Sequence, residues 1–156
     1  MTHHPSLPGE APASLAAPSA LALYKRVVGT VPGAGLEWTM TVPAGKWWAL
    51  FAVYAVLTQG ITQNPQPILF LDDGTNTFLE SIGATNGQGV STTCAYSWAP
   101  GMVLTAVAGS GAAEHSCAPI PDGLILPAGY RIRSNTLNIG ANSQWNAPAA
   151  FVAELG

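Results

Sequence analysis

Residues 41–57 read TVPAGKWWALFAVYAVL, and this stretch decides the expected fold. It ends in eleven apolar residues in succession. A helix would fit that length, but the content of Trp, Phe, Val and Tyr favours a strand. Strict alternation along a strand places Trp47 and Phe51 on one face and Trp48 and Tyr54 on the other. Both faces are then apolar, which is typical of a central strand that is covered on both sides.

The turn that opens this run nearly recurs later in the chain. Residues 42–45 read VPAG and residues 126–129 read LPAG. Proline fixes φ and glycine tolerates a positive φ, so both segments predict a sharp corner in front of a strand. The flanking sequences do not otherwise align, so the two corners are not a sequence repeat. Two interpretations stay open. The segments are either equivalent corners in the two halves of a Greek-key sandwich or a coincidence in a chain rich in proline and glycine.

The rest of the chain predicts short strands between frequent turns. In residues 36–42 and again in residues 90–98, apolar side chains alternate with polar ones, as in strands with one buried face. Residues 72–76 (DDGTN) predict a hairpin turn, which fits them better than a calcium loop does. Further strands are expected at 21–31, 68–71, 77–82, 102–107, 124–126, 130–139 and 150–155, with 108–121 as a long loop. Eight to ten short strands without helical periodicity predict an all-β protein, a sandwich or a barrel.

The composition predicts one domain that is suited to permanent contact with other subunits. The chain has 156 residues, of which 48% are hydrophobic but only 8% are charged, against a usual value of about 25%. Residues 1–20 hold four prolines and predict an extended or flexible N-terminal arm, and residues 21–156 predict a single β-sandwich domain. A surface with so few charges is easily desolvated, which favours assembly.

Several classes of function are disfavoured by the same sequence. The net charge of −3 and five scattered cations argue against binding of nucleic acid. No apolar run reaches the roughly 18 residues that span a bilayer, and the N-terminus lacks the features of a signal peptide. We therefore expect no contact with a membrane and synthesis in the cytoplasm. Cys94 and Cys117 are expected to be buried thiols, with a bridge possible only if their strands are adjacent.

Catalytic and metal-binding patterns are also missing from the sequence. His3 and His4 lie in the arm, and the segment Glu114-His115-Ser116-Cys117 offers too few ligands for a usual zinc site. The chain contains neither a nucleophile elbow nor a phosphate-binding loop. We expect no catalytic residue, no metal and no cofactor, and hence a protein that is not an enzyme.

The adjacent pair Trp47 and Trp48 points to an interface. Only one of the two can face the core if the segment is a strand. The other must then lie against a second layer, a neighbouring subunit or a ligand such as a glycan, and a subunit interface is favoured because tryptophan is enriched there. The candidate interface residues are Trp47, Trp48 and Tyr54, together with Leu7 and Leu15 of the arm.

Two stretches resemble small virion proteins of tailed bacteriophages. They are TMTVPAGKWWALFAVYAVLTQG at 39–60 and GLILPAGYRIRSNTLNIGANSQWNAPAAFVAEL at 123–155. In that group, V-P-A-G-K/R-x-W leads into a long apolar strand. An L-P-x-G-[YW]-x-[IL] corner near the C-terminus then precedes a stretch rich in Asn and Gln.

The resemblance implies a jelly-roll β-sandwich of the capsid decoration, or cement, type. Such a protein lies on the exterior of the virion and bridges neighbouring major capsid subunits, often as a homotrimer. The alternative is a tail, fibre or head-spike module that recognises glycans on the host surface. The long arm at 1–20 and the segment 108–117 depart from the pattern of the group, which leaves the position within the virion open.

Overall fold

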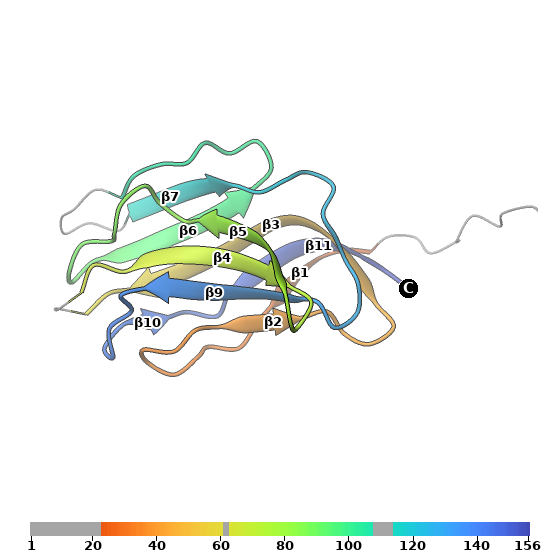
Figure 1. Ribbon diagram of the computed structural model, residues 1–156, viewed down its shortest axis with the longest axis horizontal. Coiled ribbons are helices and arrows are strands. Elements are labelled where there is room, and N and C mark those ends of the chain that lie inside the picture. The colour runs from red at the N-terminus through yellow and green to blue at the C-terminus, as the bar shows by residue number, and fades with distance from the viewer. Residues whose placement is uncertain (1–22, 61–62, 108–113) are drawn as a thin grey trace, which may run out of the picture.

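The computed structural model describes residues 23–60, 63–107 and 114–156, which form a β-sandwich of two sheets (Figure 1). This confirms the predicted all-β class. The strands are β1 (Leu23–Val28), β2 (Thr39–Thr41), β3 (Trp47–Thr58), β4 (Gln66–Asp72), β5 (Thr77–Ile82), β6 (Thr93–Ala99), β7 (Glu114–Pro119), β8 (Ile125–Leu126), β9 (Arg131–Leu137), β10 (Gln144–Trp145) and β11 (Ala149–Leu155).

The strand order is that of a jelly roll. The large sheet runs β1-β11-β3-β6-β7, with β8 and β10 also paired to β3, and the small sheet runs β2-β9-β4-β5. Four antiparallel pairs are nested along the chain, namely β4 with β5, β3 with β6, β2 with β9 and β1 with β11. This nesting is the pattern of one long hairpin rolled into two layers. In Figure 1 the small sheet lies in front of the large one.

The two Pro-Ala-Gly corners lie side by side, where the chain crosses between the sheets. The first corner joins β2 to β3 and the second joins β8 to β9, so they cross in opposite directions. The amide of Val42 donates to the carbonyl of Tyr130 at 2.9 Å, and the amide of Gly129 donates to the carbonyl of Val42 at 3.0 Å. The first of the two open interpretations is therefore correct: the corners are equivalent positions on the two arms of the rolled hairpin.

Each corner requires a left-handed residue, which gives a direct test. Gly45 has φ of 73° and Gly129 has φ of 86°, and an added Cβ would meet no atom within 4 Å at either position. Alanine at either site should therefore lower the free energy of unfolding by about 1 kcal/mol through backbone strain alone. Asparagine, which tolerates this conformation better, should cost less. Urea unfolding of Gly45→Ala, Gly45→Asn and the matching Gly129 variants checks this, and an equal loss for both substitutions would contradict it.

Strict alternation along β3 is wrong, because the strand contains a β-bulge. Ala52 pairs with Phe151 and Leu50 pairs with Val152, so Phe51 has no partner in β11. The extra residue shifts the phase of the strand. The core-facing residues are therefore Trp48 and Leu50 before the bulge, followed by Val53, Ala55 and Leu57 after it. Phe51 and Tyr54 consequently both face away from the core.

Other sequence predictions hold in part. The hairpin at β4 and β5 and the inward side chains Cys94, Tyr96 and Trp98 are confirmed. The predicted strand at 102–107 is irregular, and the predicted loop at 108–121 contains β7, although 108–113 lie outside the described residues. β7 forms because it pairs in parallel with β6, and because the buried hydroxyl of Ser116 donates to the carbonyl of Gly83 at 2.8 Å.

Four aromatic rings fill the core between the sheets. Tyr96 lies 5.9 Å from Trp98 and 6.1 Å from Trp145, and Trp145 meets Trp38 edge-on at 6.2 Å, measured between ring centroids. All four side chains are almost completely buried. Tyr96, Trp98 and Trp145 belong to the large sheet and Trp38 directly precedes β2 of the small sheet, so these rings pack the two sheets together.

Candidate functional site

The most distinctive surface of the molecule is the outer face of the large sheet. Residues directly opposite each other in paired strands share a face, so the register defines this surface. Its large side chains come from β1, β11 and β3, and its small ones come mostly from β6 and β7. The main members are Tyr24, Arg26, Val28, Trp47, Ala49, Phe51, Ala52, Tyr54, Val56, Ala95, Ser97, Ala99, His115, Cys117, Phe151 and Ala153.

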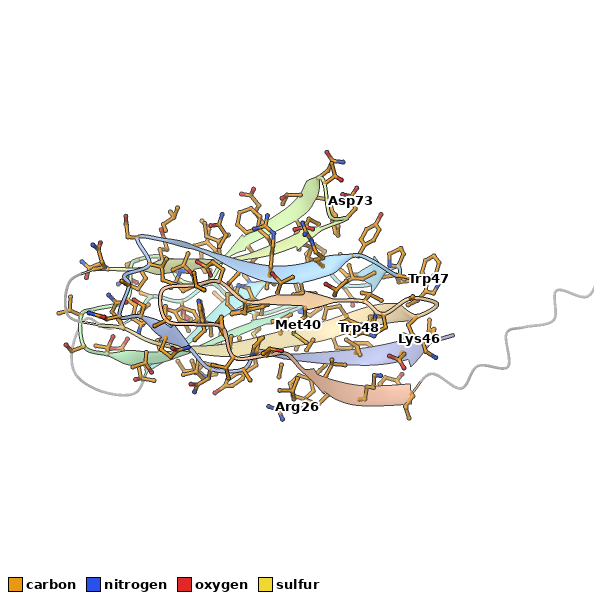
Figure 2. All side chains as sticks on the ribbon, turned by 90° about the horizontal axis from the view of Figure 1, so that it is seen from below. Arg26, Met40, Lys46, Trp47, Trp48 and Asp73 are labelled. Atoms are coloured by element: carbon orange, nitrogen blue, oxygen red, sulfur yellow. The ribbon has the colours of Figure 1, made fainter. Side chains whose placement is uncertain are left out.

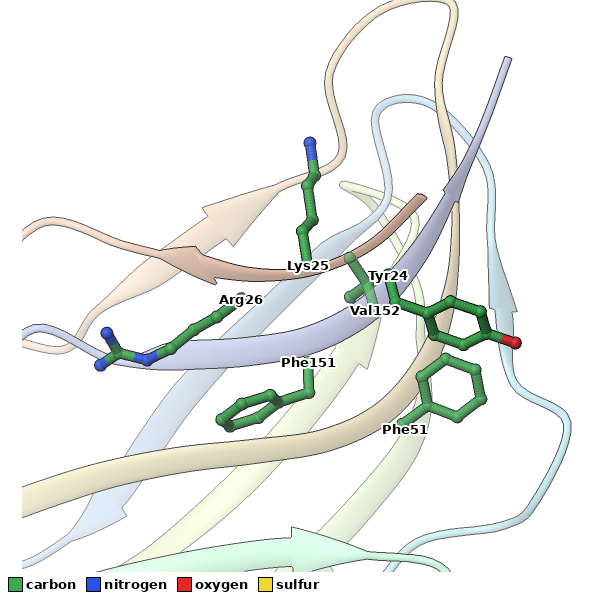
Figure 3. A pocket seen from close by; sticks show the side chains of 6 residues that line it. All are labelled: Tyr24, Lys25, Arg26, Phe51, Phe151 and Val152. Atoms are coloured by element: carbon green, nitrogen blue, oxygen red, sulfur yellow. The ribbon is translucent and has the colours of Figure 1, made fainter. Parts of the chain in front are cut away.

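Aromatic rings from three strands gather at one end of this face (Figure 3). Tyr24 of β1 and Phe51 of β3 stack with their centroids 5.6 Å apart and their planes at 26°. Together with Phe151 of β11 and the stem of Arg26 they line an open hollow of about 280 Å³. Phe51 faces outward in phase with Trp47 and Ala49, and the bulge that follows it brings Tyr54 to the same face. The hollow therefore forms only when the three strands β1, β11 and β3 are paired in the sheet.

The outer face of the large sheet is almost free of charge. Within the described strands the only charged side chain on this face is that of Arg26 on β1, and the only imidazole is that of His115 on β7, at the two margins. Nε2 of His115 is hydrogen-bonded to Oγ of Ser97 at 2.8 Å. Figure 2 shows Arg26 and the Asp73 turn on opposite sides of the sandwich. The centre of the face therefore carries no charge that water must solvate, so it is easily desolvated.

The outer face of the small sheet is different, because it carries a charged cluster. The Nε–H of Arg131 donates to Oδ1 of Asp72 at 2.6 Å, and the Nε–H of Arg133 donates to Oδ2 at 2.5 Å. The guanidinium of Arg133 also lies 4.7 Å from the ring centroid of Phe70. Burial by itself raises the pKa of Asp72, but the two arginine hydrogen bonds outweigh it and lower the pKa to about 2. The carboxylate and the two guanidiniums pair with one another, so the cluster stabilises the small sheet and needs no ligand to balance its charges.

The polar groups of the turn after Asp72 also find their hydrogen-bond partners within the protein. Oδ1 of Asp73 accepts the amides of Thr75 at 2.8 Å and Asn76 at 2.7 Å, and Gly74 takes a positive φ of 96°. These bonds describe a hairpin turn, as the sequence predicted.

The structure separates the five candidate interface residues. Trp47 and Tyr54 lie on the outer face of the large sheet, with 48% and 37% of their surface exposed. Trp48 is 2% exposed, and its Nε1–H donates to Glu154 at 3.1 Å, so it is a core residue and its assignment to an interface is corrected. Leu7 and Leu15 lie outside the described residues.

Three residues of the aromatic end were missed by the sequence argument. Tyr24, Phe51 and Phe151 lie far apart in the chain, and they meet only through the pairing of β1, β11 and β3. A signal was present in 149–155, where apolar residues occupy both alternating positions of the strand. A strand that is apolar on both faces predicts a covered outer surface.

The cysteines and histidine do not form a chemical centre. β6 and β7 are adjacent, but Cys94 faces the core while Cys117 faces outward, so the two thiols remain free. Desolvation raises the pKa of Cys94 to about 11. Among the described residues no group of three His, Cys, Asp or Glu side chains is placed to hold a metal ion.

Comparison of the chain with protein-family models, with curated proteins and with solved structures finds no match. Across the parts of the chain that the structure describes, no helix is both long and apolar enough to cross a membrane.

Proposed function

We propose that this chain is a structural virion protein that decorates a phage capsid and bridges neighbouring major capsid subunits. The observation that carries the proposal is the outer face of the large sheet, which is free of charge at its centre and has exposed rings at one end. Contiguous apolar surface of this kind marks protein–protein contact sites. A rigid sandwich loses little conformational freedom when it binds, which suits a permanent structural role.

The resemblance to tailed-phage virion proteins supports the same proposal. Its two motifs, VPAGKWW and LPAGYRI, occupy the paired corners that turn the chain from one sheet into the other. On a capsid, each bridging contact contributes modestly, and symmetry multiplies it over the shell. In this role the sandwich is a spacer of fixed shape.

The test is the location of the protein in intact particles. We expect mass spectrometry of purified virions to detect the chain in a copy number comparable to that of the major capsid protein. Electron cryo-microscopy should place its density on the capsid exterior, between major capsid subunits. Particles that lack the protein should release their genome at a lower temperature than complete particles. Absence of the chain from particles, or density confined to the tail, would overturn the proposal.

A second candidate function, recognition of host glycans, is favoured by the hollow between Tyr24, Phe51 and Phe151. Exposed rings next to a polar group such as Arg26 resemble the mixture of apolar surface and placed polar atoms found in ligand sites. A glycan array probed with the purified protein tests it. Binding that disappears in a folded Phe51→Ala variant would favour this function over capsid decoration.

A further inference from the structure

We propose that the outer face of the large sheet pairs with the same face of a second copy of this chain, about a two-fold axis that lies in the interface plane and passes through Tyr54. Capsid decoration is not a premise of this pairing, which concerns the free protein in solution. The pairing uses the same face as the proposed capsid contact, so a chain that binds a capsid through this face has first left the dimer. In such a dimer the small sheets point outward on both sides. Four observations carry the proposal, namely exposed area, the placement of charge, the distribution of side-chain size, and the register around Tyr54.

The exposed aromatic area is large enough for an interface. Five rings on the face are exposed, from 37% for Tyr54 to 73% for Tyr24, with Trp47, Phe51 and Phe151 between them. At about 200 Å² for each free ring, they leave roughly 500 Å² of aromatic surface in water. A two-fold pairing covers this area on both copies, which brings the rings alone to about 1,000 Å², the lower range of specific interfaces.

The guanidinium and the imidazole that a dimer interface would have to desolvate lie at the edges of the face. Arg26 is on β1 and His115 is on β7, the two outermost strands of the large sheet. The three central strands, β11, β3 and β6, present no charged side chain on this side. An apolar centre inside a polar margin is the usual anatomy of a protein interface. A two-fold pairing keeps the guanidinium of Arg26 and the imidazole of His115 at the solvated margin.

Large side chains lie at one end of the face and small ones at the other, so the two ends have complementary shapes. The rings of Tyr24, Phe51 and Phe151 occupy one end, while small residues occupy the region beyond Tyr54 on β6. Sheets that pack face to face must interdigitate their side chains to fill the layer of about 10 Å between them. If the ring-rich ends of the two copies lay over each other, their large side chains would collide there and leave gaps over the small residues. A two-fold rotation instead lays the ring-rich end of one copy on the small-residue end of the other.

The register gives the positions of the residues on the face, and the direction of the two-fold axis then decides which residues meet. Tyr54 lies in the central strand and pairs with Ala149 on one side and Ser97 on the other. Phe151 lies two residues beyond Ala149 toward the Trp47 end, and Ala95 lies two residues beyond Ser97 toward the opposite end. A two-fold axis that lies in the interface plane, passes through Tyr54 and runs at right angles to the line from Phe151 to Ala95 exchanges these two positions. The ring of Phe151 from each copy lies over Ala95 of the second copy.

This pairing predicts an asymmetric rescue between two variants of the full chain. Phe151→Glu and Ala95→Arg each place two unpaired charges in the homodimer interface, and each should raise its dissociation constant roughly 100-fold. Mixed in equal amounts, the two variant chains should form a heterodimer again. That heterodimer contains one Glu–Arg contact and one unchanged Phe–Ala contact. Sedimentation velocity over a range of concentrations measures all three samples.

A matched control lies on the other side of the sandwich. Ile82 is 45% exposed on the outer face of the small sheet, so Ile82→Glu should leave the dimer unchanged. Circular dichroism shows whether each variant is folded, and recovery in the mixture shows it independently. A wild-type chain that stays monomeric at roughly 100 µM would overturn the proposal. So would a trimer, a dimer insensitive to both interface variants, or a mixture that fails to recover.

Discussion

Replacing Trp48 with alanine should lower the free energy of unfolding by about 3–5 kcal/mol. The side chain is 2% exposed and belongs to the core cluster, so its removal leaves a large cavity between the sheets. Its Nε1–H also donates to Oε2 of Glu154 at 3.1 Å, and that bond is lost as well. Urea unfolding followed by circular dichroism gives the free energy directly.

The neighbouring residue provides the control. Trp47 is 48% exposed on the outer face of the large sheet, so Trp47→Ala should change the free energy of unfolding by no more than about 1 kcal/mol. The measurement belongs at a protein concentration low enough that only monomer is present. Similar losses for the two variants would contradict the division of the pair into one core and one surface residue.

Replacing Asp72 with asparagine should be the most damaging change on the outer face of the small sheet. Its carboxylate is held by Arg131 and Arg133, and its side chain is 2% exposed. Asparagine leaves two adjacent guanidiniums without their shared counter-charge. We expect a loss of about 2–3 kcal/mol at pH 7, at or below the lower end for a broken buried pair, because both arginines remain partly exposed.

The same variant predicts a change in pH dependence. The pKa of Asp72 in the folded protein is about 2, below its ordinary value of 3.8. The carboxylate therefore stabilises the fold fully above about pH 4, and this contribution disappears as the pH falls toward 2. Asp72→Asn cannot titrate, so its stability should fall less steeply than that of the unmodified chain between pH 4 and pH 2. Parallel profiles in urea unfolding would contradict the role of Asp72.

The class of fold and the inward face of several strands could be predicted because the relevant signals are local. Alternation placed Trp38, Met40 and Val42 in the core, and it did the same for the strand that contains Tyr96. It was wrong for Leu36, which precedes β2 and is exposed. Proline and glycine located both corners. These patterns depend on the backbone of one strand, and the core of a sandwich needs nothing else to specify which face is buried.

The features that could not be predicted depend on pairing between distant strands. The bulge at Phe51 exists only relative to β11, so no pattern within β3 reveals it. β7 is poor in strong strand formers and is stabilised by β6 beside it. The outer aromatic end draws Tyr24, Phe51 and Phe151 from three strands. Trp47 and Tyr54 could be singled out because they lie in the apolar run. The apolar pattern of 149–155 also pointed to the outer side of Phe151, whereas the position of Tyr24 depends on the pairing of β1 with β11.

The nested pairing of the strands sets an order in which the molecule can fold. β4 and β5 are joined by a short turn, whereas β1 and β11 pair residues from almost opposite ends of the described chain. Because closure of a longer loop costs more entropy, we expect the innermost pair to form first and the outermost pair last. Pulse-labelled hydrogen exchange should accordingly protect amides of β4 before those of β1. The aromatic end needs β1, β11 and β3 together, so a nascent chain does not yet present these exposed rings as one surface.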